Sequence, residues 1–282
     1  MTTVGFIGLG QIGAPMAQRL AGWPDGLVVH DLRDEATKPF ADLGATVATS
    51  VAELGAAADV ISVMVLDDEQ VRAVVAELLT TARSGTVIAV HSTVRADTVE
   101  ELGQVAATSG VHVLDAPVSG GFIGAHDGTL AVLVGGERAA FELAREPFER
   151  FASLVVHFGP VGAGTRAKLA RNLMHFIAYT GATEAQRLAE AAGLDLLKLG
   201  QVVRHSDAVT GGAGAIMVRP TAAPLNPDDG LYDIFCHTRS LAEKDLELAL
   251  ELGAGLGVEL PLGHLALERF AAGLGVPHPP GG

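Results

Sequence analysis

The sequence predicts an α/β protein, in which a mostly parallel sheet is followed by an all-α domain built on one long helix. Two observations carry this prediction. Up to about residue 160, short apolar runs rich in β-branched residues alternate with segments of helical periodicity. Beyond that point the periodicity is helical. We therefore expect two domains, residues 1–160 and 161–282, which agrees with roughly 150 residues per domain in a chain of 282 residues.

Seven apolar runs in the first half are expected to form strands. They are Val4–Gly8, Leu27–Asp31, Val60–Val65, Thr86–Val90, Val111–Leu114, Leu130–Val134 and Leu154–Phe158. Three of the segments between them, Ala14–Leu20, Glu69–Leu79 and Asp97–Ala106, have helical spacing. Strands separated by helices form βαβ units. The early runs are apolar almost throughout, which is typical of a parallel sheet covered by helices on both faces.

One long helix is expected from Gly164 to about Ala192, because this segment contains no proline and its large apolar residues recur near helical spacing. Gly193 is expected to end that helix and Asp195 to start the next one. Three further segments complete the second half: an irregular region, a helical block and a frayed Gly/Pro-rich tail, at Val209–Gly230, Leu241–Ala272 and Gly273–Gly282.

The composition excludes several classes of function. Lys plus Arg is 19 and Asp plus Glu is 33, so the net charge is −14, which disfavours nucleic-acid binding. The single cysteine excludes an internal disulfide and a four-sulfur zinc site. The histidines have no metal-ligand spacing, so we expect no metal. No apolar stretch is long enough to span a membrane, and the N-terminus does not resemble a signal peptide. We therefore expect a cytoplasmic protein.

A glycine-rich loop with the pattern G-x-G-x-x-G follows the first expected strand and opens the first expected helix. Its residues are Gly8, Leu9, Gly10, Gln11, Ile12 and Gly13. The glycines allow a tight turn, a close approach of a pyrophosphate and close packing of helix on strand. The helix N-terminus offers free N–H groups to the phosphates. The loop in this context predicts a Rossmann-type dinucleotide-binding domain.

Asp31 ends the second expected strand, 23 residues after Gly8. This is close to the spacing of about 20 residues for the acid that binds the ribose 2′-hydroxyl. A carboxylate here accepts from the hydroxyl and repels a 2′-phosphate, which favours NAD over NADP. Leu32 and Arg33 follow and complete the expected cofactor contacts. Arg33 keeps NADP open, because a guanidinium can hold a phosphate in bidentate fashion.

Two later motifs carry chemical groups of interest. The first is suited to binding a carboxylate, and the second is suited to proton transfer. In the segment Asp115–Gly121, Ser119 offers a hydroxyl, and Gly120 and Gly121 offer backbone N–H groups. In the segment Gly162–Asn172, Lys168 and Asn172 lie one helical turn apart on one face. Lys168 stands among small and apolar residues, and a buried lysine can have a pKa low enough for proton transfer. The alternative from composition is a surface lysine.

These motifs resemble those of the β-hydroxyacid dehydrogenase family, which includes 3-hydroxyisobutyrate dehydrogenase. The resemblance spans roughly residues 3 to 270. The matching motifs, in chain order, are the glycine loop, Ser92-Thr93, Asp115–Gly121, the helix with Lys168 and Asn172, and Lys244-Asp245-Leu246.

The resemblance implies a role for each matching residue. Lys168 would be the general acid/base, and Ser119, Gly120 and Gly121 would hold the substrate carboxylate. Asn172 would orient the carboxylate or the reacting oxygen. Thr93 would position the substrate and the nicotinamide. Lys244 would line the site near the cofactor, and Asp245 would support Lys244.

The chain departs from the family pattern at His237, seven residues before Lys244, where the family commonly has a pocket phenylalanine. A histidine there implies a more polar or differently shaped substrate, unless Phe235 takes the place by a local realignment. Residues 205–235 match poorly, and the C-terminal end is short.

We therefore expect an enzyme that transfers a hydride between NAD and a small 3-hydroxy acid similar to 3-hydroxyisobutyrate. Alternatives are an NADP-dependent semialdehyde or glyoxylate reductase, an imine reductase of the same architecture, and a catalytically silent NAD(H)-binding module. Lys168 and Ser119 argue against the imine reductase. The expected partners are a small carboxylate-bearing hydroxy acid or semialdehyde and further copies of the chain, in a homodimer or homotetramer.

Overall fold

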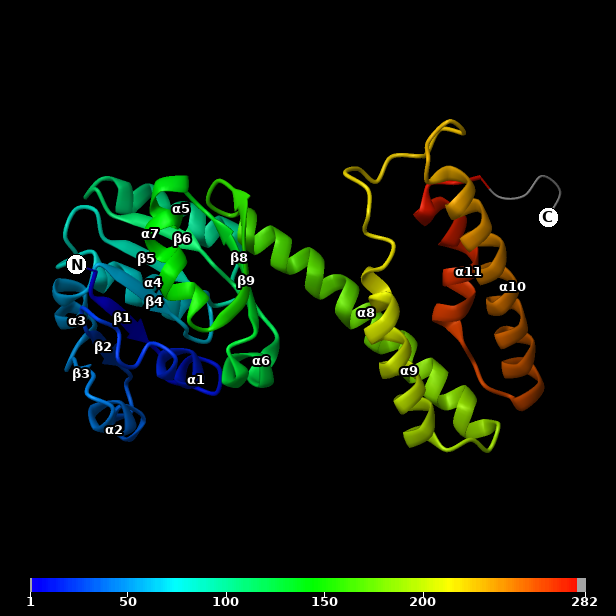
Figure 1. Ribbon diagram of the computed structural model, residues 1–282, viewed down its shortest axis with the longest axis horizontal. Helices are drawn as coiled ribbons and strands as arrows, with labels where there is room; N and C mark the ends of the chain where they lie inside the picture. The colour runs from blue at the N-terminus through cyan, green and yellow to red at the C-terminus, as the bar shows by residue number, and fades with distance from the viewer. Residues whose placement is uncertain (1, 278–282) are drawn as a thin grey trace. The chain divides into compact units, whose positions relative to one another are not determined.

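The computed structural model describes residues 2–277, so the end of the tail, residues 278–282, lies outside the described residues (Figure 1). Its contacts divide the chain into two units, one that ends at Arg171 and one that begins at Asn172. The first unit is a sheet with helices and the second is helical, which confirms the predicted fold class. The domain boundary near residue 160 stays a prediction from the sequence.

The sheet of the first unit has the strand order β3-β2-β1-β4-β5-β6-β8-β7, and β9 pairs with β8. The strands are β1 (Val4–Ile7), β2 (Leu27–His30), β3 (Thr46–Val47), β4 (Val60–Val63), β5 (Val87–Val90), β6 (His112–Asp115), β7 (Val118–Ser119), β8 (Leu130–Gly135) and β9 (Ala152–Gly159). All pairs from β3 to β6 are parallel, and β8 runs antiparallel to β6 and β7. The seven expected strands are present. The two that were not expected, β3 and β7, have two residues each, too few to show a periodicity.

Helices cover both faces of this sheet. They are α1 (Gly13–Gln18), α2 (Asp34–Asp42), α3 (Val51–Ala57), α4 (Asp68–Leu78), α5 (Ala96–Ala107), α6 (Gly121–Asp127) and α7 (Arg138–Glu149). Neighbouring residues of one strand enter opposite cores: Phe6 packs in the core that contains Phe141 and Phe148, and Ile7 in the one that contains Val75 and Leu78. Burial on both faces explains why the strands are apolar throughout.

The carboxyl ends of the parallel strands open on one edge of the sheet, which is where doubly wound sheets bind ligands. Four of the connections that leave the sheet there contain predicted site residues. They are the glycine loop after β1, the turn at Asp31 after β2, the segment at Ser92 after β5 and the segment from Ala116 after β6. The candidate site is built from these connections.

The helical unit begins within the long helix α8 (Ala163–Ala191), whose bounds agree with the expected helix. Gly193 follows in a left-handed conformation at φ 73°, and Asp195 caps α9 (Leu196–Thr210) by accepting from the backbone N–H groups of Leu197 and Lys198. Both expectations are confirmed. A short 3-10 turn, η1 (Gly212–Gly214), lies in the region expected to be irregular.

The segment from Leu241 to Ala272, which was expected to be a helical block, is helical, but its first helix begins earlier than expected, at Tyr232. The structure has two helices there, α10 (Tyr232–Leu256) and α11 (Pro261–Leu274). Gly257 ends α10 in a left-handed conformation at φ 68°, and Pro261 opens α11 at its first turn. None of the helices within residues 2–277 has the length and apolar character needed to cross a membrane.

Candidate active site

The glycine loop has the backbone that dinucleotide binding requires. A Cβ at Gly8 would lie 2.2 Å from the carbonyl oxygen of Met64, and one at Gly13 would lie 2.0 Å from the carbonyl oxygen of Gly8. Both positions therefore exclude a side chain for reasons of packing. A Cβ at Gly10 would meet nothing within 4 Å. Gly10 instead leaves open space over the start of α1, where a pyrophosphate would approach the backbone.

A hollow of about 820 Å³ runs along this loop. Its lining includes Gly8, Gly10 and Asp31, and it extends to Val65 and Leu66 after β4. Its size is within the range of about 300–1,000 Å³ that is typical of ligand pockets. The Gln11 and Ile12 backbone borders the same space. The loop, the acid and the hollow together fit a dinucleotide.

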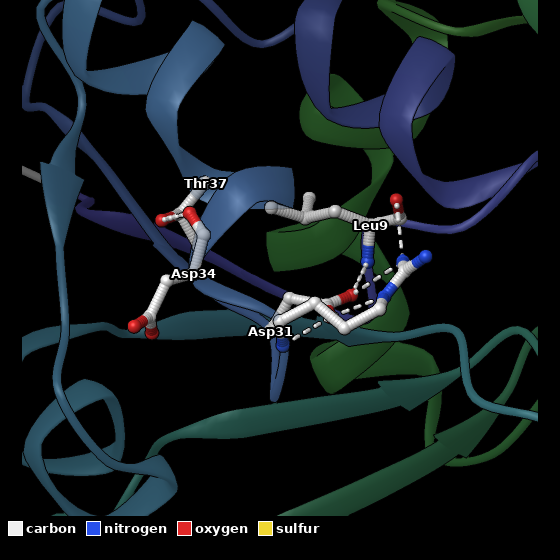
Figure 2. A network of polar contacts seen from close by, with 5 residues as sticks. Leu9, Asp31, Asp34 and Thr37 are labelled. Carbon is white, nitrogen blue, oxygen red and sulfur yellow. Dashed lines mark hydrogen bonds and ion pairs between the residues drawn. The ribbon is translucent and has the colours of Figure 1, made fainter.

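Asp31 is tied both to the glycine loop and to Arg33 (Figure 2). Its Oδ2 accepts from the backbone N–H of Leu9 at 2.7 Å, and its Oδ1 accepts from the N–H and Nε of Arg33 at 2.9 and 3.1 Å. Burial acts to raise the pKa of Asp31, but the hydrogen bonds from Arg33 and Leu9 outweigh it, so the pKa lies below its ordinary value. Asp31 is therefore an anion at the mouth of the hollow.

Arg33 lies against the loop that Asp31 holds. Its Nη2 donates to the carbonyl oxygen of Leu9 at 3.3 Å and its Nε forms an ion pair with Asp31. The guanidinium is thus engaged by the carboxylate of Asp31. Leu32 also borders the hollow, but its side chain is almost entirely exposed. Behind this turn, Thr37 donates to the carbonyl oxygen of Asp34 at 2.9 Å in the first turn of α2 (Figure 2).

The segment after β5 is fixed by Ser92 and His91. Ser92 Oγ donates to the carbonyl oxygen of Val65 at 2.7 Å and accepts from the N–H of the same residue at 3.0 Å. This double contact joins the segments that follow β4 and β5. Thr93, the predicted substrate and nicotinamide residue, comes next and is exposed.

His91 was not identified from the sequence, and the structure gives it a structural role at the site. Its ring is buried, Nδ1 lies 2.7 Å from the carbonyl oxygen of Ala116, and Nε2 lies 3.0 Å from Ser62 Oγ. A carbonyl oxygen only accepts, so Nδ1 carries the proton and Nε2 accepts from Ser62. Burial lowers the pKa of His91 to about 4, so the ring is neutral. It joins the end of β5 to Asp115–Gly121, the segment predicted to bind the substrate carboxylate and named here the substrate motif.

Asp115 connects the substrate motif to α8. Its Oδ1 accepts from the N–H of Gly162 at 2.7 Å and its Oδ2 from the N–H of Thr165 at 2.6 Å, so one carboxyl group holds the first turn of α8. Burial raises the pKa of Asp115 by more than these hydrogen bonds lower it. A Cβ at Gly135 would lie 2.3 Å from Asp115 Oδ1. The close packing sets the start of α8 against the end of β6.

Lys168 lies on α8 one turn beyond these contacts. It is 7% exposed, so it is not a surface lysine, and its Nζ donates to the carbonyl oxygen of Val118 at 2.5 Å. Burial, and to a lesser extent the positive charge of Arg171, lower the pKa of Lys168 to about 8. The amine therefore lies beside the backbone of the substrate motif and can both give and take a proton near neutral pH.

The predicted carboxylate-binding residues follow Val118 directly. Ser119 ends β7, and Gly120 and Gly121 continue at φ 133° and 63°, a conformation that favours glycine. Both glycines are exposed. Lys168 and the substrate motif are thus brought together within the first unit.

The remaining predicted residues lie in the helical unit. Asn172 follows Lys168 by one turn on α8. On α10, His237 and Lys244 are both exposed, and Lys244 pairs with Asp245 at 3.0 Å. Phe235 is buried with Leu274 and Val276 in the core of this unit. Phe235 therefore does not replace His237 on the exposed face of α10.

Within residues 2–277, no group of three or more His, Cys, Asp or Glu side chains is arranged to hold a metal ion.

Both halves of the chain match known families. Residues 3–159 match the NAD-binding domain of 6-phosphogluconate dehydrogenase, and residues 162–276 match the family described as NAD-binding of NADP-dependent 3-hydroxyisobutyrate dehydrogenase. The chain belongs to the 3-hydroxyisobutyrate dehydrogenase family. The family consists of NAD(P)-dependent hydroxyacid dehydrogenases, so the resemblance found in the sequence is confirmed.

Two relatives in Mycobacterium tuberculosis illustrate the range of this family. An uncharacterized oxidoreductase is 56% identical over 98% of this chain and 94% of its own length. A probable 3-hydroxyisobutyrate dehydrogenase is 34% identical over 96% of this chain and 92% of its own length.

Solved structures have the same fold. A putative oxidoreductase from Mycobacterium avium is 54% identical, with a TM-score of 0.95 over 99% of this chain and 100% of its own. The M. tuberculosis 3-hydroxyisobutyrate dehydrogenase solved with L-serine is 34% identical, with a TM-score of 0.68 over 96% of this chain and 94% of its own. An imine reductase from Myxococcus stipitatus with NAD⁺ has a TM-score of 0.75 over 98% of this chain and 96% of its own, at 20% identity, which shows the fold alone.

Proposed function

We propose that this member of the 3-hydroxyisobutyrate dehydrogenase family catalyses the reversible, NAD-dependent oxidation of a small 3-hydroxy acid, with Lys168 as the general acid/base. The observation that supports it most is the position of the Lys168 amine. It is buried beside the backbone of Val118, one residue before Ser119, and its pKa is lowered to about 8. A buried lysine with a lowered pKa is suited to proton transfer, whereas an ordinary surface lysine is solvated and stays charged.

The residues of the first unit would divide the chemistry as follows. Ser119 Oγ and the N–H groups of Gly120 and Gly121 bind the substrate carboxylate and so fix the hydroxyl beside Lys168. In oxidation, neutral Lys168 takes the hydroxyl proton, and in reduction its ammonium form returns a proton to the carbonyl oxygen. When bound, the nicotinamide accepts or supplies the hydride. Thr93 is proposed to position the substrate against it.

Asn172, Lys244 and His237 complete the proposed set. Asn172 orients the carboxylate or the reacting oxygen, and Lys244 acts beside the cofactor. The exposed imidazole of His237 supports a substrate with a polar far end. We take 3-hydroxyisobutyrate as the first substrate to test and L-serine as the second, because a 34% identical relative was solved with L-serine.

We propose NAD as the preferred cofactor. The pKa of Asp31 lies below its ordinary value, so an anion stands where the ribose hydroxyls bind, and an anion repels a 2′-phosphate. Arg33, the residue that could bind that phosphate, is paired with the same carboxylate at 3.1 Å. NADP-dependent reduction of a semialdehyde or glyoxylate is the nearest alternative, and it requires Arg33 to leave this pair.

We also propose that the chain functions as a homodimer or homotetramer. Taken by itself, the helical unit has a buried apolar cluster of only Phe235, Leu274 and Val276 among the described residues. Meanwhile Leu173 and Phe176 on α8 are 66% and 58% exposed. Such a surface is typical of helices that pack against another subunit. A monomer in sedimentation equilibrium at micromolar concentration would contradict this part of the proposal.

A substrate panel tests the proposed reaction. Formation of reduced cofactor is followed with NAD or NADP against 3-hydroxyisobutyrate, 3-hydroxypropionate, glycerate and L-serine. We expect turnover of one of these acids, with NAD preferred. Binding of NADH without turnover of any acid or of the corresponding semialdehydes would contradict the proposal and favour a silent NAD(H)-binding module. Reduction of a cyclic imine in place of these substrates would favour the imine reductase.

A further inference from the structure

The hollow along the glycine loop continues beyond Asp31. Past the carboxylate it is lined by His30, Val51, Ala73, Val74 and Glu77, from β2, α3 and α4. The glycine loop binds the pyrophosphate and Asp31 the adenosine ribose. The base attached to that ribose must therefore enter this further end, whose valine and alanine side chains suit the faces of a flat ring.

His30 is the last residue of β2 and is fixed from behind. Its Nδ1 lies 2.9 Å from the carbonyl oxygen of Ala48. Because a carbonyl oxygen only accepts, Nδ1 must carry a proton, and in the neutral ring the lone pair is then on Nε2. The side chain is 8% exposed and lines the hollow. Within residues 2–277, the hydrogen bond shown for the His30 ring is this one contact of Nδ1 with Ala48, and Nε2 is left to face the hollow.

The other polar side chains at this end already have backbone partners. Glu77 Oε1 accepts from the N–H of Ala52 at 3.1 Å, and Gln70 Oε1 accepts from the N–H of Leu66 at 3.0 Å. In each of these two side chains, one accepting oxygen is therefore already bonded to the protein backbone. His30 differs because its contact with Ala48 fixes the tautomer and leaves the acceptor on the opposite side of the ring.

We propose that Nε2 of His30 accepts a hydrogen bond from the 6-amino group of adenine and makes the site specific for an adenine dinucleotide. Along its ring edge adenine offers N1, N3 and N7, which are acceptors, and one donor, the 6-amino group. A neutral imidazole whose remaining nitrogen accepts is complementary to that donor. The inference rests on the proposed cofactor site and does not depend on which substrate is oxidised.

The test compares two reduced cofactors by direct binding. NADH and its deaminated analogue, reduced nicotinamide hypoxanthine dinucleotide, share the fluorescent nicotinamide and differ at position 6 of the purine, where an oxo group replaces the amine and N1 gains a proton. Affinities are measured by nicotinamide fluorescence. We expect the wild-type protein to bind NADH about tenfold more tightly, because the analogue sets an oxygen against the lone pair.

His30→Phe is the decisive variant, since it keeps a ring in the hollow and removes the acceptor. We expect it to bind both cofactors with equal affinity, close to that of the wild type for the analogue. Asp31→Asn is the matched control. It should weaken both cofactors by the same factor and leave the preference intact, because the ribose contact does not sense the base.

Three outcomes would overturn the proposal. One is equal affinity of the wild-type protein for the two cofactors, a result that needs no variant and so does not depend on how His30→Phe folds. Another is a preference for NADH that persists in His30→Phe with an unchanged circular dichroism spectrum, which would assign the contact to Glu77 or Gln70. The third is loss of the preference in Asp31→Asn. Because every readout is binding, failure of the substrate panel would leave these results interpretable.

Discussion

Lys168 on α8 donates a hydrogen bond of 2.5 Å from Nζ to the carbonyl oxygen of Val118 in β7. This contact joins the long helix to the substrate motif. It places the amine beside Val118, the residue that precedes Ser119 in the sequence. Asp115 holds the first turn of the same helix, so the position of Lys168 depends on the sheet and not only on its own side chain.

The rate of oxidation should depend on pH through the ionisation of Lys168. The pKa of this lysine is lowered to about 8, and oxidation needs the neutral amine. We therefore expect kcat/KM for oxidation to be low below that pH and to rise to a plateau above it. The dependence for reduction should be the reverse, because the ammonium form is the acid. A profile for oxidation that is flat from about pH 6 to about pH 10, a range that spans the lowered pKa of about 8, would contradict this assignment.

Arg171→Gln should raise the pKa of Lys168, because the charge of Arg171 lowers it. The midpoint of the pH profile for oxidation should then move to higher pH, and oxidation at pH 7 should slow by about two- to fivefold, as expected for the loss of one nearby surface charge. Arg171→Lys keeps the charge and is the matched control. An equal slowing in both variants, with the midpoint unmoved, would show that Arg171 acts through its shape.

Asp115→Asn should weaken both stability and turnover. The amide has one accepting oxygen, so one of the two backbone N–H groups at the start of α8 loses its acceptor in a buried place. We expect a loss of about 1–3 kcal/mol in the free energy of unfolding, measured by urea denaturation. We also expect kcat to fall while NADH binding is kept. Asp42→Asn, at an exposed position, should change stability by less than about 0.5 kcal/mol. Wild-type kcat in Asp115→Asn would argue that α8 is held mainly by other contacts.

Asp31→Asn should shift the cofactor preference toward NADP. The change removes the anion that repels a 2′-phosphate and releases Arg33 to bind one. We expect the ratio of kcat/KM for NAD to that for NADP to fall at least about tenfold. The double variant with Arg33→Ala should lose the gain for NADP. If the gain persists without Arg33, another group binds the phosphate.

The elements that could be predicted from the sequence are those whose structure depends on the order of residues within one short segment. The strands β1, β2 and β4 are continuous apolar runs, and the glycine loop has a spacing that few other structures require. The break between α10 and α11 was not identified in the sequence, although it lies at Gly257 and Pro261, two residue types that commonly mark helix ends.

The parts of the site that could not be predicted depend on contacts between distant segments. Asp115 belongs to a recognisable motif, but its hold on Gly162 and Thr165 exists only once β6 and α8 are packed together. His30 and His91 could not be singled out in the sequence, because no spacing identifies a histidine ring whose partner is a carbonyl oxygen on another segment. The exposed position of His237 likewise required the structure, which shows Phe235 turned into the core.

The most direct test of the account is the Lys168→Ala variant, measured for both turnover and NADH binding. We expect kcat to fall by at least about 100-fold, the usual contribution of a general acid/base, while NADH affinity stays within about twofold of the wild type. Lys198→Ala, at an exposed position on α9, should leave both values unchanged. Turnover of Lys168→Ala at near the wild-type rate would contradict the assignment of Lys168 as the acid/base and with it the proposed mechanism.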